Sequence, residues 1–155
     1  MSYRINDNYF IGFVEGEGMF YVSVVPSKET KTGWQVIYFF KVSQNPIGKV
    51  VLQKLKSRLD CGYLKRNSRS DHTDKSLAYV VRDFRNLTGK VIPFFDGKLI
   101  IKRDSFEKLK KVLEIVSLKR HLTGQGMKEI LDISYSMNTR KRKFKKSEIL
   151  KAYLK

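Results

Sequence analysis

Hydrophobic residues along the chain switch between a helical spacing of three to four residues and the strict alternation of a strand. The helical spacing predicts helices at residues 6–16, 46–59, 83–91, 105–118 and 126–137, with a last turn or two at 147–154. The alternation predicts strands at residues 19–25, 35–43, 63–66 and 77–82. The second helix therefore separates two hairpins.

Residues that commonly start or stop helices stand at the ends of these segments. Asn6 or Asp7 can cap the first helix. Asn45, followed by a proline, opens the second helix, and Gly62 closes it. Pro93 is expected to end the helix before it. The predicted buried stripe of the second helix is Ile47, Val51, Leu55 and Leu59.

The element order is α-β-β-α-β-β-α, followed by further helix. This order describes an α+β fold in which helices cover one face of a twisted antiparallel sheet. A chain of 155 residues is long enough to bury a real core and to form one domain. We assign residues 1–138 to that domain. Residues 139–155 form a basic tail, for which we expect a helical end.

The charge of the chain indicates a polyanionic partner. It has 32 Lys and Arg against 15 Asp and Glu, a formal net charge of +17, which is typical of nucleic-acid binding. No apolar run long enough for a membrane span or a signal peptide is present in the sequence. A single cysteine, Cys61, excludes an intramolecular disulfide and a cysteine-based zinc site. Metals with oxygen ligands remain.

Residues 8–20, which read NYFIGFVEGEGMF, set two glutamates at the end of a glycine-spaced helix. Gly12 and Gly16 would let a second backbone approach closely. If two such helices pack side by side, Glu15 and Glu17 meet their counterparts and repel unless a cation such as Mg²⁺ lies between them. A two-fold homodimer would supply the second helix. The alternative is a helix packed on its own sheet, with two glutamates solvating its end.

The segment FIGFVEGEG resembles the LAGLIDADG motif of homing endonucleases. Three later segments are similar to the family's strand, helix and hairpin series. They are FFKVSQNPIGKVVLQKLKSRLDCGYLKR from Phe39, IIKRDSFEKLKKVLEIV from Ile100 and HLTGQGMKEILDISYSMN from His121. The resemblance covers about residues 8–138 and implies a saddle-shaped sheet. A single copy of the motif resembles the homodimeric branch of the family.

The resemblance implies roles for individual residues. Glu17 matches the family's metal-binding catalytic carboxylate, and Gly16 would offer its carbonyl oxygen to the metal. Glu15 matches an acidic position that is usually structural. Gln44 matches a polar residue that organises water at the cleavage centre. Lys102 matches a lysine that lies near the scissile phosphates.

Two of these positions leave alternatives. Lys98 and Arg103 are close enough in sequence to take the place of the active-site lysine. A basic residue is expected one helical turn after Gln44, but Gly48 stands there, with Lys49 beside it as a weak substitute. Without the family context, Gln44 would be read as a capping or solvent-facing residue, and the lysines as a solvated helix start.

DNA recognition would follow from the sheet, because an antiparallel ribbon fits the major groove. Its outward side chains can read base edges while basic side chains hold phosphates, so we expect steep salt dependence. The expected DNA-binding residues are Ser23, Val25, Ser27, Gln35, Ile37, Lys41, Lys65, Arg66, Asn67, Arg69, Tyr79 and, in the tail, Arg140.

The resemblance therefore predicts a homodimeric, site-specific endonuclease that uses Mg²⁺ or Mn²⁺ and cuts both strands of a long pseudo-palindromic DNA site. Gly12 and Gly16 would form its dimer interface. Two alternatives use the same fold: a maturase that binds its host intron RNA, and a DNA-binding regulator that does not cleave. Proteins of this kind are usually intron-encoded. We expect an intracellular location in a mitochondrion, a chloroplast or a bacterial cytoplasm, with no membrane partner.

Overall fold

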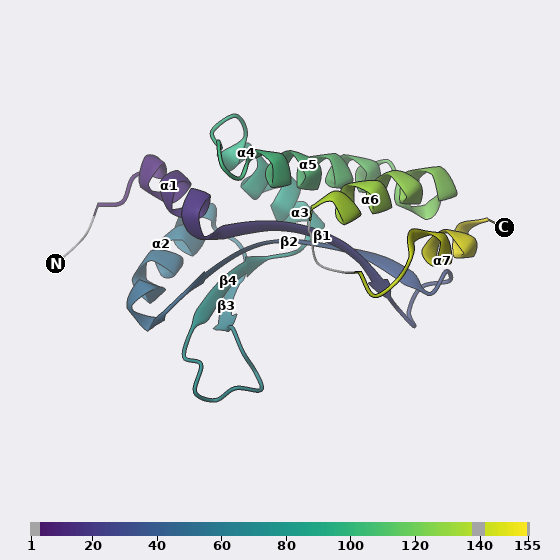
Figure 1. Ribbon diagram of the computed structural model, residues 1–155. Coiled ribbons are helices and arrows are strands. Elements are labelled where there is room, and N and C mark those ends of the chain that lie inside the picture. Colours follow the sequence, from purple (N-terminus) through teal and green to yellow (C-terminus); the bar gives the residue numbers. More distant parts are fainter. Residues whose placement is uncertain (1–3, 138–141, 155) are drawn as a thin grey trace. The chain divides into compact units, whose positions relative to one another are not determined.

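The computed structural model describes residues 4–137 and 142–154. Its elements follow the predicted order (Figure 1). The helices are α1 (Asp7–Glu17), α2 (Lys49–Leu59), α3 (Phe84–Asn86), α4 (Ile92–Phe95), α5 (Arg103–Ser117), α6 (Gly124–Ser136) and α7 (Lys146–Leu150). The strands are β1 (Gly18–Pro26), β2 (Trp34–Gln44), β3 (Tyr63–Arg66) and β4 (Leu77–Val81).

The four strands form one antiparallel sheet in the order β1-β2-β4-β3, which confirms the predicted α+β class. The chain divides into two compact units. The first comprises Met1–Phe20 and Phe39–Phe106, and the second comprises Tyr21–Tyr38 and Glu107–Lys155. No helix among the described residues is long and apolar enough to cross a lipid bilayer.

The core of the first unit contains a cluster of aromatic side chains. The ring of Phe20 lies 5.2 Å from Phe40, 5.7 Å from Phe95 and 5.3 Å from Phe106, measured between centroids. Phe40 also meets Tyr79 edge-on at 6.1 Å. Edge-to-face and offset pairs at these distances add to the free energy gained by burying the rings. The cluster fixes α1 and β1 through Phe20, the third residue after α1 ends.

The start of α1 is capped as predicted, and its end requires a glycine. The side-chain oxygen of Asn6 accepts a hydrogen bond from the N–H of Tyr9 at 2.9 Å. At the other end α1 leads directly into β1 (Figure 1). A Cβ atom on Gly18 would lie 2.6 Å from Cγ1 and 2.8 Å from the carbonyl oxygen of Val14. Only a residue without a side chain fits this close approach.

The predicted buried stripe of α2 is wrong at Ile47 and Val51, and Val51 is only half-buried. Ile47 is 92% exposed, because residues 46–48 form a 3₁₀ turn before α2 begins. A 3₁₀ turn has three residues per turn, so it shifts the phase of the stripe relative to a continuous α-helix. The residues that α2 buries are Leu52, Leu55 and Leu59.

Pro93 does not end the helical segment that precedes it, contrary to the prediction. A π-helical turn at Leu87–Val91 follows α3 and leads into α4, which contains Pro93 as its second residue. The π turn interrupts the regular hydrogen-bond pattern, so Pro93 lies in the first turn of a new helix. In the first turn of a helix a backbone N–H has no partner within the helix. Proline lacks this N–H, so its presence there costs little.

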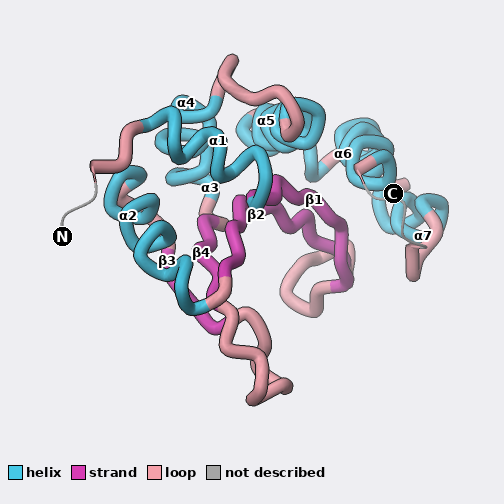
Figure 2. The backbone as a smooth tube through the Cα atoms, turned by 60° about the vertical axis from the view of Figure 1, so that its left-hand side comes forward, coloured by secondary structure: helices cyan, strands magenta, loops and turns pink. Residues whose placement is uncertain are grey.

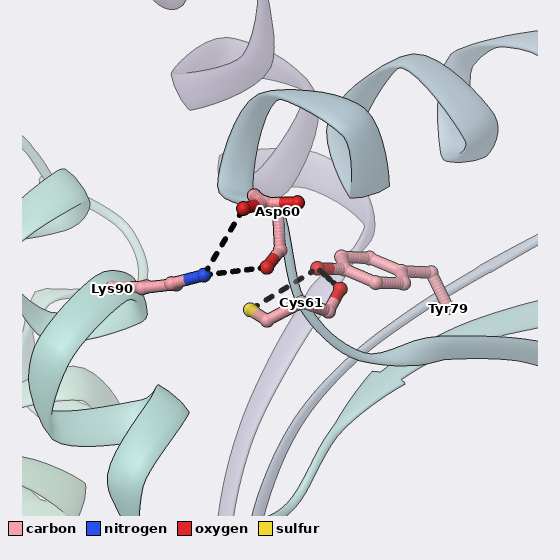
Figure 3. Close-up of polar contacts among 4 residues, drawn as sticks. All are labelled: Asp60, Cys61, Tyr79 and Lys90. Atoms are coloured by element: carbon pink, nitrogen blue, oxygen red, sulfur yellow. Dashed lines mark hydrogen bonds and ion pairs between the residues drawn. The ribbon is translucent and has the colours of Figure 1, made fainter.

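Side chains from two other elements hold the turn from α2 into β3 (Figure 3). Asp60 adopts a left-handed conformation as the C-cap, with φ of 53°. Lys90 Nζ donates a hydrogen bond to the carbonyl oxygen of Asp60 at 2.6 Å and lies 3.4 Å from its carboxylate. The Tyr79 hydroxyl donates to the carbonyl oxygen of Cys61 at 2.8 Å. These bonds satisfy carbonyl groups that the end of a helix leaves without partners.

The second unit packs its helices on the outer halves of β1 and β2. The Ser134 hydroxyl, buried on α6, donates to the carbonyl oxygen of Val22 at 3.0 Å. The predicted helical end of the tail is confirmed by α7 and a 3₁₀ turn at Lys151–Tyr153. Ile149 of α7 is buried, and the Thr32 hydroxyl lies 3.1 Å from the hydroxyl of Tyr153. This part of the tail therefore belongs to the packed structure.

Candidate functional site

Glu15 anchors the segment that leads into α5. Its carboxylate accepts hydrogen bonds from three successive backbone N–H groups, those of Ile100, Ile101 and Lys102. The N–O distances are 2.7 Å for Ile101 and 3.1 Å for Lys102. These groups lie just before the first residue of α5, where a helix has free N–H groups and a partial positive charge. Glu15 therefore has a structural role: its carboxylate joins the last turn of α1 to the backbone of Lys102.

Glu17 has the opposite environment. It is the last residue of α1, its side chain is exposed, and α1 has no basic residue in its last turn. The C-terminal end of a helix carries a partial negative charge, which disfavours a carboxylate unless a cation lies nearby. In a chain with a net charge of +17, this placement concentrates negative charge at one point.

The oxygen donors at the end of α1 suit a hard divalent cation. The Glu17 carboxylate and the carbonyl oxygen of Gly16 belong to adjacent residues, and Mg²⁺ and Ca²⁺ prefer oxygen ligands. Within the described residues, no three His, Cys, Asp or Glu side chains gather into a group that could hold a metal. A cation held by these two oxygens would need further ligands to complete its coordination.

The structure separates the two lysines that the sequence left as alternatives. Lys102 is joined to Glu15 through its backbone N–H, near the end of α1 that carries Glu17. Lys98 Nζ lies 5.4 Å from the centroid of the Phe94 ring, and Lys98 helps Arg58 to lower the pKa of Asp7. Asp7 is the first residue of α1, about 15 Å from the last at 1.5 Å per residue. Lys98 therefore lies near the start of α1, at the opposite end of the helix from Glu17.

Gln44 is the last residue of β2 and pairs with Leu77 of β4. Its half-buried side chain packs over Gly48, the residue at which the sequence resemblance predicts a basic side chain. Its amide makes no hydrogen bond to any other described residue. The groups of this amide are therefore available to water or to a phosphate.

The glycines of the first helix differ in their surroundings. A Cβ atom added to Gly12 or Gly16 would meet no atom within 4 Å, and both residues are exposed. The space beside Gly18, in contrast, is occupied by Val14 of the same helix. Gly12 and Gly16 thus leave one side of α1 open to close approach by another backbone.

The register of the inner strands places basic side chains on one face of the sheet. Lys41 pairs with Val80, and Lys65 pairs with Ala78. Directly paired residues share a face, and so do residues two apart on one strand. Lys41 and Lys65 therefore lie on the same face, on either side of Ala78 and Val80 of β4. Burial, with a further contribution from Lys65, lowers the pKa of Lys41. A polyanion beside this face would relieve the repulsion between the two lysines.

Tyr79 does not lie on this face, contrary to the prediction. It pairs with Val42 on β2 and is 0% exposed, with its ring in the core. The expected alternation of β4 was shifted by one residue, and such a shift moves every side chain to the other face. Ser23 was also expected to point outward, but it is 8% exposed. Val22, Ser23 and Val24 are all buried, so β1 is covered on both sides at this point.

Replacing Tyr79 with phenylalanine tests this correction. The change removes the hydrogen bond to the carbonyl oxygen of Cys61, so we expect the free energy of unfolding to fall by about 1 kcal/mol. DNA affinity should stay unchanged at every salt concentration. Chemical denaturation and a binding titration measure the two quantities. A loss of DNA affinity without a loss of stability would restore Tyr79 as a contact residue.

The remaining predicted contacts fall into three groups. Val25, Ser27, Gln35 and Ile37 are half-buried, whereas Arg66, Asn67 and Arg69 are exposed. Arg140 lies outside the described residues. Arg66 has a use that the sequence did not reveal: its guanidinium donates to the carbonyl oxygens of His72 and Asp74, at 3.5 and 3.2 Å. It thereby shapes the loop at 67–76, which projects beyond β3 and β4 (Figure 2).

Comparisons with known proteins agree on one family. The model of the LAGLIDADG endonuclease family matches residues 10–116. A Neurospora crassa protein named "Probable intron-encoded endonuclease 2" is 28% identical over 138 residues, 86% of this chain and 29% of its own length. The chain spans less than a third of the length of the curated relatives it matches.

Solved structures extend the similarity to the fold. The homing endonuclease I-TnaI is 30% identical, with 97% of each chain covered and a TM-score of 0.78. I-SmaMI, solved bound to an uncleaved DNA target in the presence of calcium ions, is 30% identical over 90% of this chain and 47% of its own, with a TM-score of 0.80. The family match covers most of the chain, including the part of α1 that carries the two glutamates, and this protein therefore belongs to the LAGLIDADG endonuclease family.

Proposed function

We propose that this chain is a site-specific homing endonuclease that cuts both strands of double-stranded DNA with the help of divalent cations. The observation that carries the proposal is the different use of the two glutamates at the end of α1. The carboxylate of Glu15 accepts three backbone hydrogen bonds. Glu17 is exposed at a helix C-terminus, where its charge costs stability and so calls for a function.

The residues around Glu17 would divide the work of hydrolysis among them. Glu17 and the carbonyl oxygen of Gly16 would hold Mg²⁺ or Mn²⁺, which supplies water activation and stabilisation of the leaving oxygen when it is bound. Lys102, fixed by Glu15, would bring positive charge to the scissile phosphate. The amide of Gln44, which has no hydrogen-bond partner in the described part of the chain, would orient water. Lys41 and Lys65 would contact DNA phosphates from the face of the sheet that they share.

A second copy of α1 would complete the site. The exposed side of α1 at Gly12 and Gly16 leaves room for another helix, and a close approach there would bring two Glu17 carboxylates together. We propose that a second chain supplies this helix in a two-fold dimer, which would read a pseudo-palindromic site. The match to the homing endonuclease I-TnaI, which covers 97% of each chain, supports the endonuclease proposal.

The test is cleavage of a plasmid library carrying randomised target sites. With Mg²⁺ or Mn²⁺ we expect double-strand cuts at one site, and removing the metal with EDTA should stop them. Sedimentation of the DNA complex should give the mass of two chains. If tight binding to a site never leads to a cut under any divalent metal, the enzymatic proposal fails. A complex that contains one chain would refute the dimer.

The relatives favour one further candidate, because two of them are named as probable intron-encoded endonucleases. A protein encoded in an intron has that intron's RNA as a potential substrate, and the large positive charge suits RNA as well as DNA. A splicing assay with the host intron distinguishes this maturase function. Splicing that depends on the protein, together with absent cleavage of the plasmid library, would favour it.

A further inference from the structure

The position one helical turn after Gln44 is occupied by a glycine that the backbone does not require. Gly48 has φ of −85° and ψ of 0°, a conformation open to any residue. Its neighbour is what excludes a side chain. A Cβ atom at residue 48 would lie 2.6 Å from Oε1, 2.8 Å from Cβ and 2.9 Å from Cγ of Gln44. Contacts this short cannot exist, so any larger residue must move Gln44.

The contact arises from the local chain path. Gln44 ends β2, and the 3₁₀ turn at Pro46–Gly48 folds the next residues back beneath it. The N–H of Gly48 donates to the carbonyl oxygen of Asn45 at 2.9 Å, which closes this turn. The side chain of Gln44 then lies where a side chain of residue 48 would begin. Its amide oxygen is the atom nearest to that position.

The Gln44 amide lies directly against Gly48. Among the described residues it has no hydrogen-bond partner, although the side chain is half-buried. A Cβ atom at residue 48 would therefore displace the whole Gln44 side chain: the backbone must shift to separate the two Cβ atoms, and the amide turns to another rotamer.

We propose that Gly48 is a positioning residue for Gln44, and that the missing side chain at residue 48 sets where the Gln44 amide meets water or phosphate. The inference rests on the proposed function, in which Gln44 orients water for cleavage. It also explains a departure of this chain from the family pattern. A basic side chain at residue 48 and the present position of Gln44 exclude one another, so this chain orients water with Gln44 and no basic partner at that position.

Gly48→Ala tests the inference, with Gly89→Ala as the matched control. A Cβ atom on Gly89 would meet nothing within 4 Å. We expect Gly48→Ala to slow single-turnover cleavage about 100-fold, the size of effect that a displacement of about 1 Å can cause. DNA affinity measured in Ca²⁺ should change less than about threefold, because binding is spread over many phosphates. Gly89→Ala should match the wild type in both measurements.

The double variant Gln44→Ala/Gly48→Ala separates positioning from a general structural role. Gln44→Ala alone should slow cleavage, and adding Gly48→Ala should slow it little further, because the group through which residue 48 acts is already gone. If Gln44→Ala cleaves like the wild type, the role of Gln44 in the proposed function is refuted, and the inference falls with it. If Gln44→Ala is slow but Gly48→Ala is not, the inference alone is overturned.

Protein stability provides a second readout if Gly48→Ala folds poorly. Gln44→Gly removes the Cβ, Cγ and Oε1 atoms that clash, so Gly48→Ala should lower the melting temperature of the Gln44→Gly variant far less than that of the wild type. An equal loss of melting temperature in the two backgrounds would show that residue 48 packs against the backbone rather than against the side chain of Gln44, and it would overturn the inference.

Discussion

Replacing Glu17 with glutamine should lower the rate of DNA cleavage on the order of a thousandfold, the scale on which removal of one electrostatic group acts in a catalytic site. Glutamine keeps the size and one oxygen of the side chain but loses the charge that would hold a cation. Stability should be unchanged or slightly higher, since an exposed carboxylate at a helix C-terminus is unfavourable by a few tenths of a kcal/mol.

Single-turnover cleavage, DNA binding in Ca²⁺ and thermal unfolding measure these three effects. Glu107→Gln, an exposed glutamate on α5, is the charge-matched control and should behave as the wild type in all three. Cleavage by Glu17→Gln within tenfold of the wild-type rate would remove Glu17 from the catalytic site. A large loss of stability would instead make it a structural residue.

The same substitution two residues earlier should act mainly on stability. Glu15→Gln leaves three backbone N–H groups with a neutral acceptor, and its own amide hydrogens face them. Hydrogen bonds to a charged group contribute more than neutral ones, so we expect the free energy of unfolding to fall by about 2 kcal/mol. Cleavage should also slow, because Lys102 loses the bond that ties it to the end of α1.

Urea denaturation checks the stability of Glu15→Gln, and comparison with Glu17→Gln controls for the lost charge. Cleavage by Glu15→Gln should recover partly at low temperature, where more of the segment before α5 remains in place. Glu17→Gln should show no such recovery. Equal stability of the two variants would contradict the division of roles between the glutamates.

The hydrophobic pattern predicted the element order well because periodicity is a local property. The bounds of β3 agree with the prediction, and α1 carries the expected Asn6 cap. The pattern failed where a short irregular turn changed its phase. The 3₁₀ turn before α2 left Ile47 exposed, and the π turn before α4 moved Pro93 into a first turn.

The sequence motif predicted only part of the candidate site, namely the residues that lie within the motif itself. The motif placed Glu17 at the end of a helix, and the resemblance suggested a structural use for Glu15. It could not reveal the partner of Glu15, because Ile100 to Lys102 lie more than 80 residues away in sequence and three backbone N–H groups leave no signature in the letters. For the same reason, it could not choose between Lys98 and Lys102.

The sequence alone thus determined the order of helices and strands, the basic character of the chain and the glycine-spaced helix that ends in two glutamates. These features depend on residues close together in the chain. The tertiary structure decided which face each side chain occupies and which distant groups meet. The register between β2 and β4 buried Tyr79 and put Lys41 and Lys65 on one face, because strand pairing fixes the alternation of both strands together. The fold likewise made Glu15 a structural residue and left Glu17 exposed.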